Sequence, residues 1–299
     1  MSESIELTRN IPATVQDIFA VASKFNSSAS PFLEAGLREE GVSSSLFLFT
    51  ALSAIIFSGL FFLQWPFSYA FSSTFRTLSW DDKMSWSSYI LSMIHAPTSA
   101  LLASICLVEG YIDVGVGEQL FTYVTDLQVI VLSWTLGYMI VDQCIILAFP
   151  KAFKDWTALV IHHFIVFSSY TLGATYSPPT GTYLFLAYQV QEWVNPCLTM
   201  RWFLEKMDMK ESTAYLINGL SLFVLWFVIR IVFGTYVCYF SVAYLPEEAW
   251  SKPALVLTLT LGCIFQSLQY YWGYKILKGV VRALKKLLSG GDEGKPKLD

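Results

Sequence analysis

The sequence predicts an all-α polytopic membrane protein, a helical bundle with about seven transmembrane helices. Of its 299 residues, 55% are hydrophobic and only 14% are charged, whereas about a quarter of a soluble domain is charged. Seven apolar windows are long enough to cross about 30 Å of hydrocarbon, which needs about 20 residues at ~1.5 Å each. The formal net charge of −4 is small, so no nucleic-acid partner is expected.

The seven windows define the predicted spans. They are Leu46–Phe67, Ser87–Val108, Asp126–Phe149, Thr157–Gly173, Thr182–Phe203, Ala214–Phe240 and Ala254–Leu277. The fourth is short, and the fifth carries Gln189, Gln191, Glu192 and Asn195. Both are still predicted to span, because Trp, Tyr, Lys and Arg cluster at their ends as interface anchors. Pro196, next to Asn195, predicts a kink in the fifth span.

Basic residues fall on alternate connections. Those of the first, third and fifth connections are Arg76, Lys83, Lys151, Lys154, Arg201, Lys206 and Lys210, whereas the second and fourth connections hold none. Lys275 lies at the end of the last span, and six more basic residues follow it. Because cytosolic loops carry an excess of Lys and Arg, the C-terminus is predicted in the cytosol and the N-terminus in the lumen.

This topology divides the chain into four parts. Residues 1–45 form a lumenal N-terminal segment, 46–79 the first transmembrane helix and its loop, 80–284 a domain of six further spans, and 285–299 a cytosolic tail. The first forty residues are polar and mixed in charge, without a basic lead into an apolar run. The first span is therefore expected to act as an uncleaved anchor.

Three smaller features bear on location and redox chemistry. Asn26-Ser27-Ser28 is a glycosylation sequon on the predicted lumenal side. The final Lys295-Pro296-Lys297-Leu298-Asp299 has the form K-x-K-x-x, which resembles the dilysine signal read by the coat-protein retrieval machinery and so predicts the endoplasmic reticulum membrane. The five cysteines lie in apolar runs without paired spacing, so they are expected to be small buried apolar residues.

Polar side chains inside the spans raise the free energy of membrane insertion, by at least ~2.5 kcal/mol for an ionised group. Each therefore needs a hydrogen-bonding or charged partner, or a water-filled cavity. Counted at ~1.5 Å per residue from the cytosolic ends of their spans, seven lie at about 8 to 14 Å. They are His95, Asp142, His162, His163, Glu192, Asn218 and Gln266. Arg230 is the exception at roughly 25 Å, nearer the lumen. A structural role is expected for it, either paired with a carboxylate or at the lumenal interface. The shared depth predicts one cavity that opens to the cytosol.

The candidate catalytic residues are His162, His163, Asp142 and Glu192, because a histidine beside a carboxylate can act as a general base or nucleophile near neutral pH. Consecutive histidines point about 100° apart on a helix, so one is expected to act while the other orients a neighbour. The candidate cavity or substrate-binding residues are His95, Asn195, Asn218, Gln266 and Arg201. For Asn218 and Gln266, interhelical hydrogen bonding is the favoured alternative. No metal site is expected, because no two histidines have the i, i+4 spacing.

From about Trp80 to Leu284 the chain resembles the TLC domain. The matching pieces, in order, are Met93-Ile94-His95-Ala96, Gly137-Tyr138 with Asp142, Ile161-His162-His163, Glu192, Asn195-Pro196, Arg201-Trp202-Phe203, Asn218-Gly219 and Arg230. The resemblance implies six helices around a cavity, with an extra N-terminal helix. Within this family the chain most resembles the small TLC domain-containing proteins of the endoplasmic reticulum, which are linked to lipid homeostasis.

The ceramide synthases of this family acylate a sphingoid base from acyl-CoA, and they carry paired histidines followed one span later by an H-D-x-x-D motif. His162 and His163 match the pair, but the later position reads Tyr188-Gln189-Val190-Gln191-Glu192. This departure argues against ceramide synthesis and leaves acyl transfer open.

The predicted function is therefore lipid homeostasis in the endoplasmic reticulum membrane, by acyl transfer or by lipid binding near the cytosolic leaflet. Membrane lipids are the expected partners, acyl-CoA is a candidate substrate, and no cofactor is expected. The alternatives are a non-enzymatic lipid sensor or membrane scaffold and, more distantly, a seven-helix receptor or a transporter. The chain lacks the receptor motifs Asp-Arg-Tyr and Asn-Pro-x-x-Tyr at the expected helices.

Overall fold

The computed structural model describes residues 41–115, 123–175, 182–244 and 252–289. Every regular element in these ranges is helical, which confirms the all-α prediction. In chain order they are α3 (Gly41–Phe71), α4 (Ser73–Thr77), α5 (Trp80–Val114), α7 (Asp126–Ala148), η1 (Pro150–Ala152), α8 (Trp156–Thr175), α9 (Thr182–Gln189), η2 (Val190–Val194), α10 (Asn195–Lys206), α11 (Thr213–Leu225), η3 (Trp226–Phe233), α12 (Gly234–Tyr244) and α13 (Lys252–Ser289). Asn26 and the K-x-K-x-x sequence lie outside the described residues.

Four of the described helical stretches are long and apolar enough to cross a membrane: Ser45–Phe71, Trp80–Val114, Asp126–Ala148 and Thr213–Ala243. Trp156–Leu172 is apolar but shorter. The chain is thus a polytopic helical membrane protein, while the count of seven spans stays a prediction.

Two of the predicted spans are helical without being α-helical throughout. The fifth consists of α9, the 3-10 segment η2 and α10, and Pro196 lies in the first turn of α10. Proline lacks the N–H that would continue the upstream ladder, in agreement with the change from 3-10 to α geometry at this point. The kink itself stays a prediction. The sixth contains the π-helical segment η3 between α11 and α12. Such irregular turns often occur at functional sites.

Polar residues fix where several helices begin. The Ser79 side chain accepts a hydrogen bond from the backbone N–H of Asp82 at the start of α5, and Thr125 does the same for Gln128 at the start of α7. These caps satisfy N–H groups that have no partner within the helix. At the far end of α5, Gly115 adopts a φ of +73°, a conformation that glycine allows at no steric cost.

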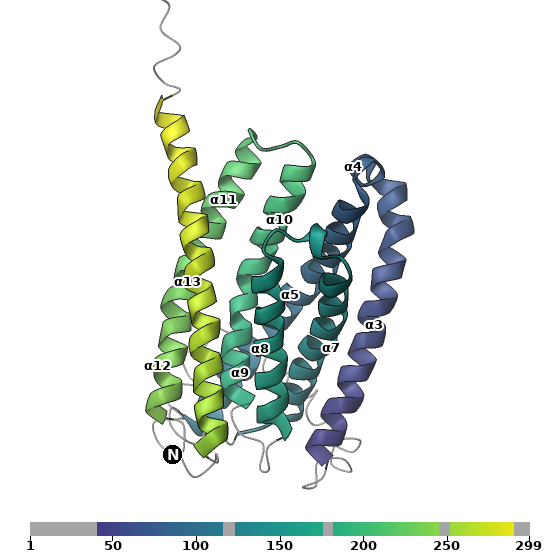
Figure 1. The fold of residues 1–299 in the computed structure, drawn as a ribbon. Helices are drawn as coiled ribbons and strands as arrows, with labels where there is room; N and C mark the ends of the chain where they lie inside the picture. The colour runs from purple at the N-terminus through teal and green to yellow at the C-terminus, as the bar shows by residue number, and fades with distance from the viewer. Residues whose placement is uncertain (1–40, 116–122, 176–181, 245–251, 290–299) are drawn as a thin grey trace, which may run out of the picture.

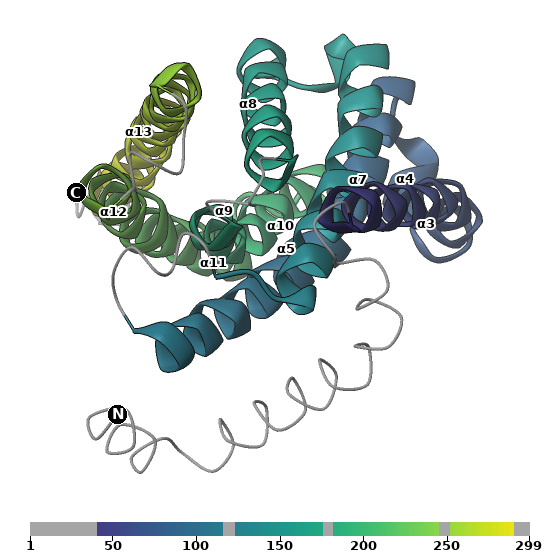
Figure 2. The same ribbon diagram turned by 90° about the horizontal axis from the view of Figure 1, so that it is seen from below.

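The helices stand side by side, with α3 at one edge and α12 and α13 at the other (Figures 1 and 2). α3 packs mainly on α7. Gly137 permits this approach, because a Cβ there would lie 2.4 Å from Cβ of Ser53. Ser53 also donates a hydrogen bond to the Trp134 carbonyl at 2.9 Å. α3 is therefore an additional helix on the outside of the bundle.

Figure 1 places α4, the α10–α11 connection and the C-terminal end of α13 at the same end of the molecule. Basic residues gather at this end, which we call the basic end. They are Arg76 in α4, Lys83 beside it, Lys206 and Lys210 at the α10–α11 connection, Lys154 paired with Glu205 of α10, Lys151 in the nearby η1, and Lys275 and Lys285 in the C-terminal half of α13. The fold therefore brings the basic connections together, as an alternating topology requires.

The expectation that all five cysteines are buried is wrong. Cys106 is buried, Cys197 and Cys238 are half-buried, and Cys144 and Cys263 are exposed; none is in a disulfide. An apolar sequence context does not require burial by protein in a membrane helix, because lipid chains provide the same apolar surroundings.

Candidate functional site

A chamber of about 1160 Å³ extends into the bundle from the basic end. It is lined by residues of α5, α7, α8, α10, α11, η3 and α13. A smaller slot of about 90 Å³ continues away from the basic end, between α8, α9, α12 and α13. Its lining is mostly apolar, including Ile165, Val166, Leu184 and Phe185.

The chamber and the slot share four wall residues, Met139, His162, Glu192 and Arg230. Two of these are oppositely charged and one is a histidine. The polar groups therefore stand where a wide, mixed cavity narrows into an apolar one. Such a sequence of surfaces matches an amphiphile, with its polar group in the chamber and its chain in the slot.

His163 and Asp142 form the most distinctive pair on the chamber wall. Nε2 of His163, on α8, lies 3.6 Å from Oδ2 of Asp142 on α7, and both side chains are buried. Asp142 is held further by hydrogen bonds from the Ser88 hydroxyl at 2.5 Å and the Tyr138 hydroxyl at 3.3 Å. Nδ1 of His163 is buried and has no hydrogen-bond partner among the described residues. A carboxylate thus lies within ion-pair distance of one ring nitrogen, and the other nitrogen has no partner among the described residues.

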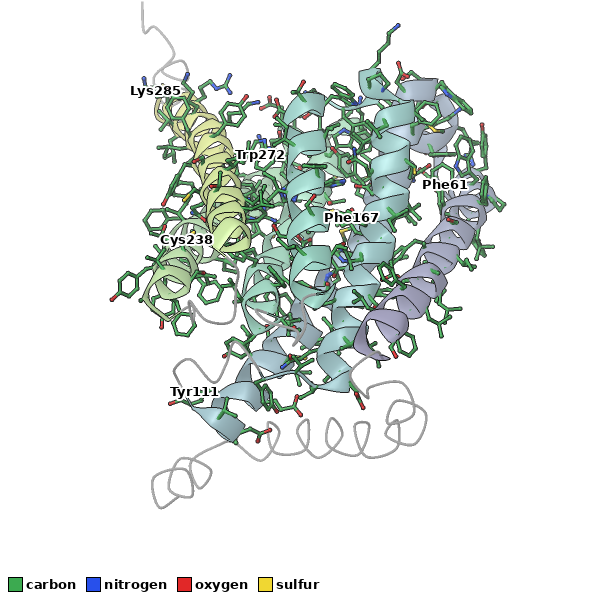
Figure 3. All side chains as sticks on the ribbon, turned by 60° about the horizontal axis from the view of Figure 1, so that its bottom comes forward. Phe61, Tyr111, Phe167, Cys238, Trp272 and Lys285 are labelled. Atoms are coloured by element: carbon green, nitrogen blue, oxygen red, sulfur yellow. The ribbon has the colours of Figure 1, made fainter. Side chains whose placement is uncertain are left out.

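His162 lies in a different environment. Its ring is 5.2 Å from that of Phe265, nearly parallel, and 5.7 Å from that of Trp272, nearly perpendicular. Trp272 lies on the side of α13 that faces α8 (Figure 3). The rings of His162 and His163 are 5.5 Å apart and inclined by 52°, so the two histidines present different faces, as their consecutive positions predict.

His95 lies behind the chamber and is not among the residues that line it or the slot. It is fully buried, stacks on Tyr138 at 4.0 Å and contacts the Thr135 hydroxyl through Nε2 at 3.1 Å. Nδ1 lies 4.0 Å from the Glu192 carboxylate. His95 is thus placed to support Tyr138 and Glu192 rather than to meet a ligand.

Glu192, Asn195 and Arg230 form a second cluster where η2 meets η3. Asn195 donates to Oε2 of Glu192 at 2.5 Å and accepts from Nη2 of Arg230 at 2.7 Å. Nη2 of Arg230 also lies 3.8 Å from Oε1 of Glu192, and its Nη1 donates to Gln269 at 2.9 Å. The guanidinium stacks over Trp226 at 4.7 Å. The cluster joins three separate stretches of the bundle.

The expected depth of Arg230, away from the polar layer, is wrong, whereas the alternative that it pairs with a carboxylate is confirmed, because Arg230 forms an ion pair with Glu192. Counting residues from the end of each span assumes that all spans start at one level and run parallel, and it ignores the length of the arginine side chain. Arg230 is therefore a member of the site that the sequence placed at another depth.

The remaining candidates divide into two groups. Asn195 and Arg201 line the chamber, whereas Asn218 and Gln266 are not among its lining residues. Asn218 donates to the Cys197 carbonyl at 2.9 Å and Gln266 to the Arg230 carbonyl at 3.0 Å. Both amides are thus used in bonds between helical segments. In the described part of the chain, no group of three His, Cys, Asp or Glu side chains could hold a metal ion.

Sequence reasoning missed Ser88 and Tyr138 as partners of Asp142. A signal for Ser88 exists in the sequence, because Ser85, Ser88, Ser92, His95 and Ser99 recur every three or four residues along α5. This spacing puts small polar groups on one face of a helix, and all five are buried. A signal exists for Tyr138 too, because it lies four residues before Asp142 in the same predicted span, a spacing that brings two side chains together on a helix.

The comparisons with known proteins identify the family. The family model described as TLC domain matches residues 85–278, more than half of the chain. TLC domain-containing protein 4-A of Xenopus laevis is 26% identical over 265 residues, covering 84% of this chain and 90% of that protein. TLC domain-containing protein 4 of Homo sapiens is 26% identical over 245 residues, covering 80% and 90%. TLC domain-containing protein 4 A of Dictyostelium discoideum is 24% identical over 221 residues, covering 72% and 82%. With the residues of its site contained in the matched range, the chain belongs to the TLC domain family of membrane proteins.

Proposed function

We propose that this protein acts in lipid homeostasis in the endoplasmic reticulum membrane, by transferring an acyl group to a lipid bound in the chamber. The observation that carries the proposal is the His163–Asp142 pair on the wall of an amphiphile-sized cavity. A histidine held by a carboxylate through one nitrogen, with its other nitrogen unoccupied, is the arrangement of a general base.

In the proposed reaction the protein groups only accept and return a proton, and none of them binds the acyl group covalently. Nδ1 of His163 takes the proton of a hydroxyl or amine on the acceptor, and the acceptor atom forms a bond to the acyl carbonyl carbon. The bond from that carbon to the leaving sulfur or oxygen breaks, and the leaving group receives the proton from the imidazolium. Asp142 stabilises the imidazolium while it exists. An acyl-CoA or an acyl ester can serve as donor.

A second candidate function is non-enzymatic lipid sensing. It is supported by the meeting of two irregular segments, because η2 carries Glu192 and η3 carries Arg230 at their point of contact. A lipid in the slot that binds better to one arrangement of these segments would increase the population of that arrangement, and no reaction is needed for this response.

The deciding experiment compares the lipid composition of cells that express the wild type, the His162→Ala/His163→Ala double variant or each single variant. Protease protection first checks that all four insert alike. We expect a lipid class to change with the wild type and with His162→Ala, but not with His163→Ala. Equal effects of the wild type and the double variant would refute acyl transfer by these histidines and favour the sensor.

The location and orientation form a separate part of the proposal. The positive-inside distribution supports a cytosolic basic end, and K-x-K-x-x supports retrieval by the coat-protein machinery. A Lys295→Ala/Lys297→Ala variant should leave the endoplasmic reticulum, which microscopy of an internally tagged chain would show. A glycosylation shift lost in Asn26→Gln would place the N-terminus in the lumen; accessibility of Asn26 from the cytosol would contradict it.

A further inference from the structure

Arg201 lies on α10 and lines the chamber, five residues before the helix ends at Lys206. At ~1.5 Å per residue this is about 8 Å from the end of the helix. Its guanidinium carbon lies 4.5 Å from the ring centroid of Tyr215 on α11. Stacking on an aromatic face orients the planar group and leaves the N–H groups at its edge free to donate.

Arg201 differs from four lysines of the same chamber, which have counter-charges. Lys154 and Lys210 contact Glu205, Lys206 contacts Asp82, and Lys275 contacts Asp155. Among the described residues, no carboxylate forms an ion pair with Arg201. Lys151 and Arg282 also line the chamber, but they are exposed, whereas Arg201 is half-buried. A half-buried cation that faces a cavity without a partner acid favours an anionic ligand.

Two glycines leave room around this guanidinium. A Cβ on Gly219 of α11 would lie 3.0 Å from Nη1 of Arg201, and a Cβ on Gly279 of α13 would lie 4.0 Å from Nη2. The first distance is tight enough to displace the guanidinium by a few tenths of an ångström, while the second is an ordinary contact. The absence of a side chain at Gly219 therefore gives Arg201 the room for its present position.

From this geometry we infer that Arg201 is a binding site for a single phosphate group of an amphiphile, whose chain extends towards the slot. A guanidinium edge donates two parallel hydrogen bonds to a phosphate. A nucleotide carrier with several phosphates fits less well, because the acids Asp82, Asp155 and Glu205 already neutralise the lysines at the chamber mouth. The ligand class is therefore a phospholipid or lysophospholipid. This inference deepens the proposed function by naming its lipid.

The test is a binding measurement on the purified full chain in a maltoside detergent, which carries no phosphate. The ligands are oleoyl lysophosphatidic acid, monooleoylglycerol as the matched lipid without phosphate, oleoyl-CoA, and inorganic phosphate. We expect lysophosphatidic acid to bind at least about tenfold more tightly than monooleoylglycerol, a difference that one charged bidentate contact supplies. Inorganic phosphate alone should bind much more weakly.

The variants distinguish loss of the contact between Arg201 and the phosphate from loss of folding. Arg201→Gln should remove most of the preference for lysophosphatidic acid. Gly219→Ala, which displaces the guanidinium, should reduce this preference, while Gly279→Ala, the matched control, should keep it. Arg201→Lys should keep part of it, because lysine retains the charge and loses the fork. Unchanged binding of monooleoylglycerol shows that a variant is folded. If Arg201→Gln does not fold, the preference for lysophosphatidic acid can still be compared between Gly219→Ala and Gly279→Ala, and a lower preference in Gly219→Ala alone supports the inference.

Three results would overturn the inference: a preference for lysophosphatidic acid that survives both Arg201→Gln and Gly219→Ala, equal affinity for inorganic phosphate, or an Arg201-dependent affinity for oleoyl-CoA above that for lysophosphatidic acid. The same measurement on His163→Ala separates this inference from the proposed function. Arg201-dependent binding that persists in His163→Ala, without any histidine-dependent change of cellular lipids, would support the phosphate site and refute acyl transfer. Loss of the phosphate preference alone would leave acyl transfer intact.

Discussion

The Arg230 guanidinium on η3 lies 3.8 Å from the Glu192 carboxylate on η2, and Asn195 bridges the two with hydrogen bonds to both. Both charged residues are buried, Glu192 to 8% exposure and Arg230 to 4%. Charges at such a position are tolerated only when they are paired and hydrogen-bonded. The pair therefore holds together two segments that depart from α-helical geometry.

Replacing Glu192 by Gln should destabilise the protein by about 3 to 5 kcal/mol, because it leaves Arg230 buried without a counter-charge. The double variant Glu192→Gln/Arg230→Gln should recover part of this loss. Thermal unfolding in detergent provides the measurement. Asp155→Asn is the control, since its partner Lys275 is exposed and its loss should cost no more than about 1 kcal/mol. Equal losses in Glu192→Gln and Asp155→Asn would show that the buried pair has no special role.

Replacing Asp142 by Asn should lower the rate of acyl transfer on the order of 10²-fold or more, because the amide no longer stabilises the imidazolium of His163. Ser88 donates to Oδ1 and Tyr138 to Oδ2. In the Asn side chain one of these hydroxyls can still donate to the amide oxygen, and the other can accept from the amide N–H, so the fold should be kept. The measurement is product formation from a labelled acyl donor by purified protein. Asp155→Asn, another carboxylate variant of the chamber wall, should keep its rate. An Asp142→Asn protein with wild-type rate would exclude His163 and Asp142 as a catalytic pair.

Replacing Gly137 by Ala should destabilise the packing of α3 on α7 by about 1 to 3 kcal/mol, because the new methyl would lie 2.4 Å from Cβ of Ser53 and 2.6 Å from the Ala54 backbone nitrogen. The control is Gly59→Ala on α3, where a Cβ would meet nothing within 4 Å. This substitution should leave the free energy of unfolding unchanged or raise it slightly. Thermal unfolding of both variants is the measurement. A Gly137→Ala protein as stable as Gly59→Ala would indicate that α3 is not tightly packed there.

The acid response of the basic end should depend on Glu205. Burial alone would raise the pKa of this carboxyl, but the hydrogen bond from Lys210 and the charges of Lys154, Lys210 and Lys206 outweigh it and hold the pKa below the ordinary value of 4.5. The same contact raises the pKa of Lys210 above 10.5. A depressed acidic pKa stabilises the fold above the unfolded value, and this contribution disappears as the pH falls through the folded value.

The wild type should therefore lose a small amount of stability as the pH falls below 4.5. A Glu205→Gln variant should lack this contribution at every pH. The difference in unfolding temperature between the two proteins should shrink as the pH falls. A difference that stays constant down to the protein's acid limit would show that the contacts of Glu205 with Lys154 and Lys210 do not stabilise the fold.

The sequence by itself determined the class of the protein and where its helices run. Apolar windows of membrane length predict the helices, Pro196 predicts the break before α10, and alternate basic connections predict that one end collects the positive charge. These features are local, because each follows from the composition of one stretch of chain. The cost of polar groups in a membrane also singled out His162, His163, Asp142 and Glu192 before any contact was known.

Only the tertiary structure decided which of these residues face each other. It paired His163 with Asp142 instead of His162, placed His95 behind the chamber, and brought Arg230 to Glu192 although counting along the helices had separated them. It also showed that Arg201 stacks on Tyr215 in a space left by Gly219. The physical reason is that such contacts depend on the tilt, rotation and relative height of helices far apart in the chain, which packing sets and residue spacing does not.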